Sequence, residues 1–293
     1  MARDYRFFLS NPSNIHFLTS EQSFALEEKM EPEIFFQLMK VLRCKPGDRV
    51  TLMAPVELSS NTAASVHFEF HYDVASAQKK TIELEFVEKK LNDRELPFHL
   101  QLVLCLPNKP EKLEFILQKA VELGVNQVIL VKGDFSQMKH ELRPERLMKI
   151  MHEAAEQSER AGIPELFIEH GLGKFMEEHR PDAGQFFVAM ERLQNVGSDQ
   201  KSKNLAELLK GKLDMPNADR RNQAAAVSII VGPEGGFSDE EKQLIQDLRI
   251  SCFSLGKRIL RMETAAILSL GIASIAGETA GFPRVPPSEL LNL

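Results

Sequence analysis

The chain has 293 residues and a formal net charge of −6, with 43% hydrophobic and 27% charged residues. The length suits one large domain or two ordinary ones, and the composition is typical of a globular protein. The acidic balance excludes a surface coated in positive charge for nonspecific nucleic-acid binding, although it allows a local basic patch. No apolar stretch reaches the roughly 20 residues needed to cross a bilayer, and the N-terminus lacks a signal-peptide core. We therefore expect a cytoplasmic protein.

The three cysteines, Cys44, Cys105 and Cys252, are far apart in the sequence. Neither a disulfide framework nor a C-x-x-C metal site is indicated. Cys105 and Cys252 lie in apolar runs, so we expect them to be buried small hydrophobic residues. The histidines form no metal-ligand pattern, and we expect no metal site.

Residues 1–92 are predicted to be rich in β-structure. Alternating apolar and polar residues predict strands at 49–53, 65–71 and 81–87. One helix is predicted at 32–42, and polar or small residues predict loops at 54–64 and 73–79. A small barrel with one helix fits this pattern.

Residues 92–95 form the predicted linker, after which strands and helices alternate. Strands are predicted at 99–105, 126–132, 165–169, 185–190, 227–231 and 250–254. Helices are predicted at 110–123, 144–161, 172–179, 238–248 and 262–277, with a short one at 205–213. This alternation indicates a parallel sheet with helices on both faces. The polar stretch 191–226 is predicted to be a solvated insertion, with contact between its basic residues and RNA as the alternative.

The stretch from 227 to 271 carries the strongest pattern. The apolar run 227–231 breaks into Gly232-Pro233-Glu234-Gly235-Gly236, and Ser238 with Glu241 forms a predicted capping box for the next helix. The run 250–255 breaks at Gly256 before another helix. Both glycine loops follow strands, where open α/β sheets bind ligands.

Backbone groups of a glycine loop can approach a flat polar ligand such as an adenine edge. A phosphate cradle is disfavoured because no Lys-Ser/Thr pair follows the glycines and Glu234 places a negative charge in the loop. Two tight turns without a ligand are the simpler alternative. The pairing of the two loops favours a ligand site.

The motifs VGPEGGFSDEE and LGKRILRMETAAILSLG resemble the C-terminal signatures of the RsmE-like small-subunit ribosomal RNA (uridine-N3) methyltransferases of the SPOUT superfamily. Agreement extends in the same order to residues 3–8, 41–48, 112–124 and 153–160. The resemblance implies an α/β protein with an RNA-binding PUA-like β-barrel at 1–92. At 93–293 it implies a SPOUT parallel-sheet methyltransferase domain with a deep trefoil knot.

The activity implied by the resemblance is methylation of N3 of a uridine in small-subunit ribosomal RNA with S-adenosyl-L-methionine (SAM). Two alternatives stay open: an RNA- or ribosome-binding protein without transfer activity, and a SAM-dependent enzyme for another RNA position. Small residues in the last helix suit a homodimer, as in SPOUT enzymes, although a buried intramolecular helix has the same pattern.

The resemblance also suggests site residues. The predicted SAM-binding set is Ala189, Met190, Gly232, Glu234, Gly235, Gly236, Leu255, Gly256, Ile259, Leu260, Arg261 and Thr264. A uridine N3 needs a proton acceptor and stabilisation of the developing anion, so the catalytic candidates are Glu153, Arg160, Arg261 and Glu263. Glu153 and Arg160 are predicted to share a helix face with Glu156, for which a surface ion-pair ladder is the alternative. Helix capping is the alternative for Glu263.

RNA contact is predicted from a basic set in residues 1–92 and from one serine, namely Arg3, Arg6, Lys40, Arg43, Lys45, Arg49 and Ser136. An ordinary solvated surface is the alternative for the basic set. Two departures from the family pattern bear on this contact. Phe35-Phe36-Gln37 stands where a histidine is usual, and Asp134-Phe135-Ser136 replaces Glu-Arg-Ser. If the family arginine binds RNA, another residue or a stacking contact of Phe135 must replace it here.

Overall fold

The structure is a computed structural model that describes residues 3–9, 22–56, 66–179, 186–191, 204–213 and 226–279. The described residues fall into two compact units. The N-terminal unit holds those up to Glu95 together with the segment Glu159–Gly162. The C-terminal unit holds Leu96–Ser158 and the described residues from Ile163 onward.

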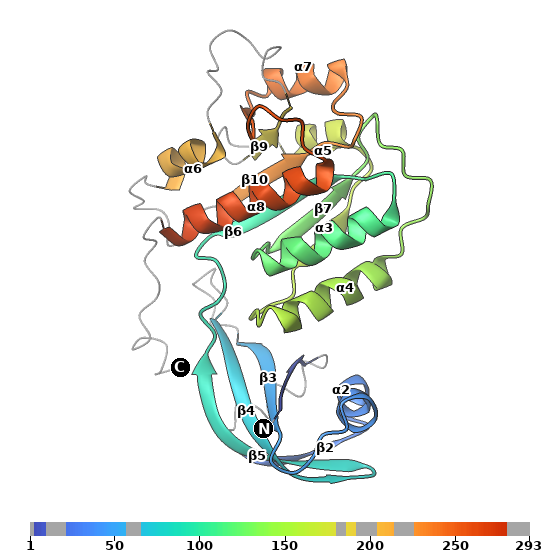
Figure 1. Cartoon of the computed structure of the whole chain (residues 1–293), viewed down its shortest axis with the longest axis vertical. Helices are drawn as coiled ribbons and strands as arrows, with labels where there is room; N and C mark the ends of the chain where they lie inside the picture. Colours follow the sequence, from blue (N-terminus) through green and yellow to red (C-terminus); the bar gives the residue numbers. More distant parts are fainter. Residues whose placement is uncertain are drawn as a thin grey trace. The chain divides into compact units, whose positions relative to one another are not determined.

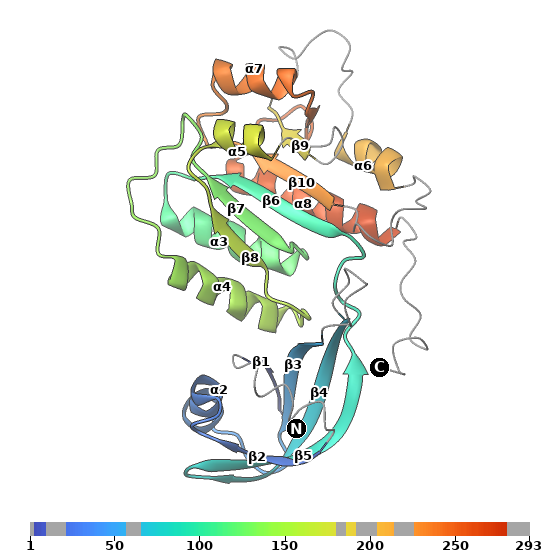
Figure 2. The ribbon, with the colours of Figure 1, turned by 180° about the vertical axis from the view of Figure 1, so that it is seen from behind.

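The N-terminal unit is built on a five-stranded sheet in the order β1-β3-β4-β5-β2 (Figures 1 and 2). Its strands are β1 (Asp4–Phe8), β2 (Phe24–Glu27), β3 (Arg49–Val56), β4 (Val66–Gln78) and β5 (Thr81–Leu91). β1 runs parallel to β3, and the other pairs are antiparallel. Helix α2 (Pro32–Phe36) continues into the π-helical turn η2 (Gln37–Val41) and packs Leu38 into the core beside Phe70 and Tyr72.

The predicted loop at 73–79 is wrong, because β4 continues to Gln78. The register of β4 against β5 shifts between His71 and Tyr72 and again between Val74 and Ser76. These irregularities interrupt the strict alternation on which the prediction relied. β3 likewise extends to Val56, into the predicted loop 54–64. Among the described residues, the sheet is open with β1 and β2 at its edges, so the predicted barrel is not confirmed.

The C-terminal unit has a six-stranded, wholly parallel sheet in the order β11-β9-β10-β6-β7-β8. The strands are β6 (His99–Cys105), β7 (Gln127–Val131), β8 (Glu165–Ile168), β9 (Phe186–Ala189), β10 (Ala226–Val231) and β11 (Ser251–Phe253). The helices are α3 (Pro110–Glu122), α4 (Pro144–Gln157), α5 (Leu172–Glu178), α6 (Leu205–Leu213), α7 (Asp239–Asp247) and α8 (Met262–Thr279). The predicted α/β alternation is confirmed.

Helices cover both faces of this sheet. α3, α4 and α8 lie on the face seen in Figure 1, and α5 lies on the face seen in Figure 2. The central strands β6, β7 and β10 are almost continuously apolar and buried, as expected for parallel strands covered on both faces. α3 buries residues spaced by three and four positions, which is the pattern of an amphipathic helix: Leu113, Ile116, Leu117, Ala120 and Val121.

The small residues of α8 serve packing within the chain. Ala266, Ser269, Ala273 and Gly277 are buried, and α8 packs against α3, α6, β6 and β10. At Gly277 a Cβ atom would lie 1.9 Å from the buried ring of Phe98. The small residues of α8 therefore allow close packing against other elements of the C-terminal unit, as the alternative of a buried intramolecular helix predicted.

Replacing Gly277 with alanine is expected to lower the free energy of unfolding by about 1–3 kcal/mol, because the Phe98 ring must shift within a packed core. Gly271 in the same helix is the matched control, since the nearest atom to its Cβ position is 4.0 Å away. Gly271→Ala is expected to raise stability by about 0.5–1 kcal/mol through helix propensity. Urea unfolding measures both values, and equal effects of the two substitutions would contradict this account.

The three cysteines are free and buried, as predicted for Cys105 and Cys252. Burial raises the pKa of the Cys252 thiol to about 11, so the reactive thiolate is scarce at neutral pH. In the described part of the chain, no group of His, Cys, Asp and Glu is arranged to hold a metal ion. Within the same residues, no helix combines the length and apolar character needed to cross a membrane.

Candidate functional site

A cavity of about 530 Å³ lies in the C-terminal unit beyond the carboxyl ends of β9, β10 and β11. Its walls come from Ala189–Glu191 at the end of β9, Val231–Phe237 at the end of β10, and Ser254–Gly256 with Arg258–Arg261 after β11. The first turn of α8 completes it, with Lys112 from α3 and Lys242 from α7. The volume is in the range of small-molecule sites, and the place is where open α/β sheets bind ligands.

The order of the strands explains why distant loops meet here. β9 lies between β10 and β11, and all three run in the same direction. Their carboxyl ends therefore share one edge of the sheet, which brings Met190 beside loops that lie tens of residues away in the sequence. The predicted pairing of the two glycine loops is confirmed.

Glycine is required in the loop after β10. A Cβ atom on Gly232 would lie 2.9 Å from the buried ring of Phe237, and one on Gly235 would lie 2.8 Å from the Cβ atom of Phe135. Gly236 has a φ of +75°, which side chains disfavour. At these three glycines the cavity wall therefore consists of backbone without side chains.

Glu234 attaches this loop to the start of α3. Its carboxylate accepts a hydrogen bond from Lys112 Nζ at 2.7 Å and from the backbone N–H of Asn108 at 3.2 Å. Burial alone raises the pKa of Glu234, but the bonds from Lys112 and Asn108 outweigh it and hold the pKa below its ordinary value. The negative charge noted in the sequence is thus already neutralised within the protein.

A double-mutant cycle with Lys112→Met and Glu234→Gln is expected to give a coupling free energy of about 1 kcal/mol or less at neutral pH. Because the folded-state pKa of Glu234 is depressed, this contribution is fully present above the ordinary value of 4.5 and is lost as the pH falls through the lower folded-state value. Urea unfolding of the four proteins at several pH values measures it. A coupling that grew on acidification would contradict the assignment.

The capping box predicted for α7 is confirmed. Ser238 Oγ accepts from the backbone N–H of Glu241, and Glu241 accepts from the N–H of Ser238. The same two side chains hold the loop after β7. Ser238 Oγ donates to Asp134 at 2.5 Å, and the N–H of Asp134 donates to Glu241 at 3.0 Å. Within that loop, Ser136 Oγ accepts from the N–H of Gly133, so Ser136 shapes the loop.

Eleven of the twelve predicted cofactor residues line the cavity, and Thr264 is exposed outside it. Ile259 is 61% exposed, so its side chain is not part of the hydrophobic core. Sequence reasoning missed Lys112, Phe237, Arg258 and Lys242 as lining residues. The position of Lys112 depends on contact with Glu234, which no local pattern signals.

Two of the four catalytic candidates, Arg261 and Glu263, line the cavity. Glu263 Oε2 is buried and has no hydrogen-bond partner among the described residues. A carboxylate oxygen is costly to bury in this state, so a partner is expected to arrive with the ligand. This geometry suits contact with a bound molecule better than a capping role alone.

Arg160 and Glu153 lie outside the cavity wall. The predicted helix 144–161 is wrong at its end, because α4 stops at Gln157 and Glu159 has a φ of +56°. Arg160 therefore does not share a helix face with Glu153. It is buried and paired with Glu95 in the N-terminal unit, at 2.5 Å between Nη2 and Oε2. Glu153 is exposed on α4, 4.0 Å from Lys149. Tertiary pairing overrode the local helix pattern at Arg160.

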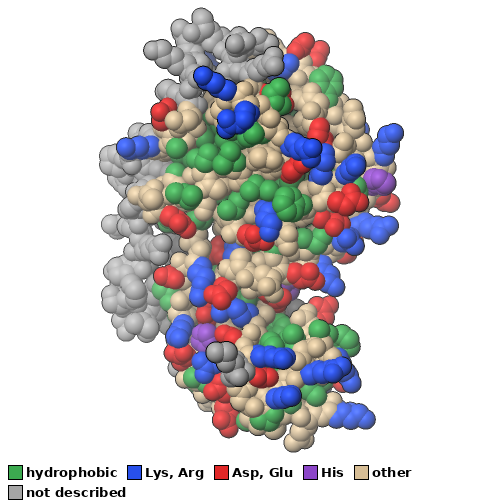
Figure 3. Space-filling model, in the orientation of Figure 1, with side chains coloured by type: hydrophobic (Ala, Val, Ile, Leu, Met, Phe, Trp, Pro, Cys, Tyr) green, Lys and Arg blue, Asp and Glu red, His purple; other side chains and the backbone are tan. Residues whose placement is uncertain are grey.

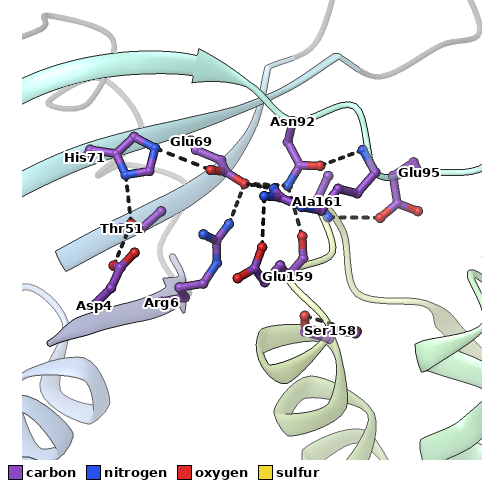
Figure 4. A network of polar contacts seen from close by, with 12 residues as sticks. Asp4, Arg6, Thr51, Glu69, His71, Asn92, Glu95, Ser158, Glu159 and Ala161 are labelled. Carbon is purple, nitrogen blue, oxygen red and sulfur yellow. Dashed lines mark hydrogen bonds and ion pairs between the residues drawn. The ribbon is translucent and has the colours of Figure 1, made fainter. Parts of the chain in front are cut away.

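Arg6 belongs to a polar network in the N-terminal unit. Figure 4 shows Arg6 and Asn92 converging on the buried carboxylate of Glu69, which Arg94 also contacts. The Arg6 side chain is only 12% exposed. Arg6 is therefore not available for the predicted RNA contact, nor does it lie on an ordinary solvated surface, since its guanidinium neutralises a buried acid.

The remaining predicted basic residues are mostly free to meet solvent. Arg3, Lys40, Arg43 and Lys45 are exposed, whereas Arg49 pairs with Asp73 at 2.9 Å. In Figure 3, several Lys and Arg side chains gather over the part of the N-terminal unit that carries α2. Both departures from the family pattern are also exposed, Phe36 at the end of α2 and Phe135 beside the glycine loop.

The parallel sheet, the glycine loops at its carboxyl edge and the cavity between these loops define a ligand-binding α/β protein. A family model described as "RNA methyltransferase domain" matches residues 94–274. The chain belongs to this RNA methyltransferase family.

Named relatives agree. The ribosomal RNA small subunit methyltransferase E of Bacillus subtilis is 29% identical over 250 residues, covering 82% of this chain and 87% of the relative. That of Mesomycoplasma hyopneumoniae is 32% identical over 190 residues, covering 64% and 74%. A methyltransferase from Legionella pneumophila, solved with SAM, matches with a TM-score of 0.68 and 26% identity over 94% of this chain and 99% of that one. The SAM-bound methyltransferase E from Neisseria gonorrhoeae, at 23% identity, shares the fold, with a TM-score of 0.65 over 92% and 95%.

Proposed function

We propose that this protein transfers a methyl group from SAM to N3 of a uridine in small-subunit ribosomal RNA. The observation that carries the proposal is the cavity at the carboxyl edge of the sheet, which combines glycine backbone, apolar side chains and Glu263, one of whose oxygens is buried without a hydrogen-bond partner among the described residues. Relatives named as small-subunit ribosomal RNA methyltransferases support the substrate class.

The cavity fits SAM by the chemistry of its walls. Gly232, Gly235 and Gly236 line the cavity without side chains, so their backbone groups would be available to bond the edge of an adenine. Leu255, Ile259 and Leu260 supply apolar surface for the faces of the ring. When bound, SAM supplies an activated methyl group on a sulfonium sulfur.

The residues at the start of α8 would handle the uridine. N3 of uridine carries a proton and is a poor nucleophile until that proton leaves. Glu263 would accept the proton, and the guanidinium of Arg261 would stabilise negative charge on the uracil carbonyl oxygens. N3 lies on the pairing edge of the base, so the uridine must be unpaired when it enters.

The N-terminal unit would bind RNA. Exposed Arg3, Lys40, Arg43 and Lys45 are suited to contact phosphates.

We extend the proposal to a PUA-like barrel for residues 1–92, and to a deep trefoil knot and a methyltransferase domain for residues 93–293. We also propose a homodimer, for which Leu268 and Ile275 offer exposed apolar side chains on α8, and a cytoplasmic location. Sedimentation velocity tests the homodimer.

The decisive experiment incubates the purified protein with unmodified small ribosomal subunits and isotope-labelled SAM, and identifies the labelled nucleosides by mass spectrometry. We expect label in 3-methyluridine. Label in another nucleoside would support methyltransferase activity but contradict N3 of uridine as its target. Absence of both label and SAM binding by calorimetry would overturn the proposal and favour a binding protein without transfer activity.

A further inference from the structure

The loop between β7 and α4 presents an aromatic ring next to the cavity. Phe135 is 48% exposed, and its Cβ atom lies where a side chain on Gly235 would otherwise be. Gly235 lines the cavity. Leaving a large aromatic ring in contact with water is unfavourable. A ligand that covers the ring removes this apolar surface from water, which favours binding.

The ring stands on a firmly held support. Its neighbours Asp134 and Ser136 are both bonded, Asp134 to Ser238 and Glu241 of the α7 cap, and Ser136 to Gly133. Ser238 and Glu241 are themselves buried. The loop that carries Phe135 and the glycine loop of the cavity are therefore joined through one capping box, which keeps the ring in place beside the cavity.

The charges of the loop that carries Phe135 favour an anionic polymer. Lys132, Lys139 and Arg143 of the same loop are exposed and form no ion pair among the described residues. Of the two acids in this loop, Asp134 already accepts a bond from Ser238, and Glu141 is exposed. An exposed aromatic ring on a loop that also carries exposed cations is a usual combination for binding single-stranded nucleic acid.

We propose that the exposed face of the Phe135 ring stacks on the nucleobase of the RNA substrate that enters the cavity. This inference rests on the proposed function, and it assigns to Phe135 the positioning of the base to be methylated. Stacking requires no hydrogen bond and tolerates any base, so it holds the base while the cavity reads its edge.

A fluorescence experiment tests the contact directly, because the chain contains no tryptophan. Phe135→Trp places a single indole at the proposed stacking position. We expect its emission to be quenched on adding a short single-stranded oligouridine RNA to the SAM-saturated protein. Phe167→Trp is the matched control, because Phe167 on the edge strand β8 is also exposed, at 43%. Its emission is expected to change little.

Transfer kinetics provide the second measurement. Phe135→Ala keeps the Cβ atom against Gly235, so SAM affinity by calorimetry is expected to stay within a few-fold of the wild type. Loss of one stacked base is expected to lower kcat/KM by about 5- to 150-fold. Phe135→Tyr is expected to restore it and Phe135→Leu is not, since only an aromatic ring stacks.

The outcomes separate this inference from the proposed function. Quenching of Phe135→Trp by RNA without methyl transfer by the wild type would retain stacking and overturn the proposed activity. Transfer that is unaffected by Phe135→Ala, or fully supported by Phe135→Leu, would overturn stacking alone. Emission of Phe135→Trp that depends on protein concentration without RNA would assign the ring to contact with a second copy and would also overturn stacking.

Discussion

Replacing Glu263 with glutamine is expected to lower the rate constant of methyl transfer by about 100- to 10,000-fold, the usual effect of removing a general base. The carboxylate lines the cavity and has one buried oxygen without a partner among the described residues. Glutamine keeps the size and shape of the side chain but cannot accept the N3 proton. Single-turnover transfer from labelled SAM to unmodified small subunits measures the rate constant, and calorimetry checks that SAM still binds.

Glu278→Gln is the matched control, because Glu278 is exposed on the same helix and outside the cavity wall. It is expected to leave the rate constant unchanged. A parallel loss of SAM affinity in Glu263→Gln would show that Glu263 binds the cofactor and is not the proton acceptor. If transfer were retained in Glu263→Gln and lost in Glu153→Gln, the proton acceptor would be Glu153 on α4.

Replacing Gly256 with alanine is expected to weaken SAM binding by about 5- to 150-fold, which corresponds to about 1–3 kcal/mol of backbone strain. Gly256 lines the cavity with a φ of +113°, a conformation that a residue with Cβ rarely adopts. Its N–H and C=O groups both bond to the hydroxyl of Ser254. Relaxing the strain would therefore move the loop that forms one wall of the site. Isothermal titration with SAM measures the effect.

Gly47→Ala is the control that separates backbone strain in the cavity wall from backbone strain elsewhere in the protein. Gly47 has a similar φ of +88° and no atom within 4 Å of its Cβ position, but it lies in the N-terminal unit. It is expected to lower the free energy of unfolding without changing SAM affinity. Equal SAM affinities for wild type and Gly256→Ala would mean that the loop after β11 does not contact the cofactor.

Much of the site was predictable because its signals are local. Gly232 to Gly236 and Gly256 each follow an apolar run that forms a strand, and Ser238 with Glu241 caps the next helix as their spacing indicates. The errors occurred where distant contacts outweigh local preference. The β4 irregularities hid the length of that strand, and Glu95 holds Arg160 beyond the end of α4.

Local sequence was sufficient to specify the alternation of strands and helices, the helix cap and both glycine loops, because each depends on neighbouring residues. The placement of β9 between β10 and β11, the pairing of Lys112 with Glu234 and the contact of Phe135 with Gly235 depend on residues far apart in the chain. The ion pair between Arg6 and Glu69 likewise joins residues far apart in the chain. Such contacts form when the sheet assembles, so they became visible in the folded chain alone.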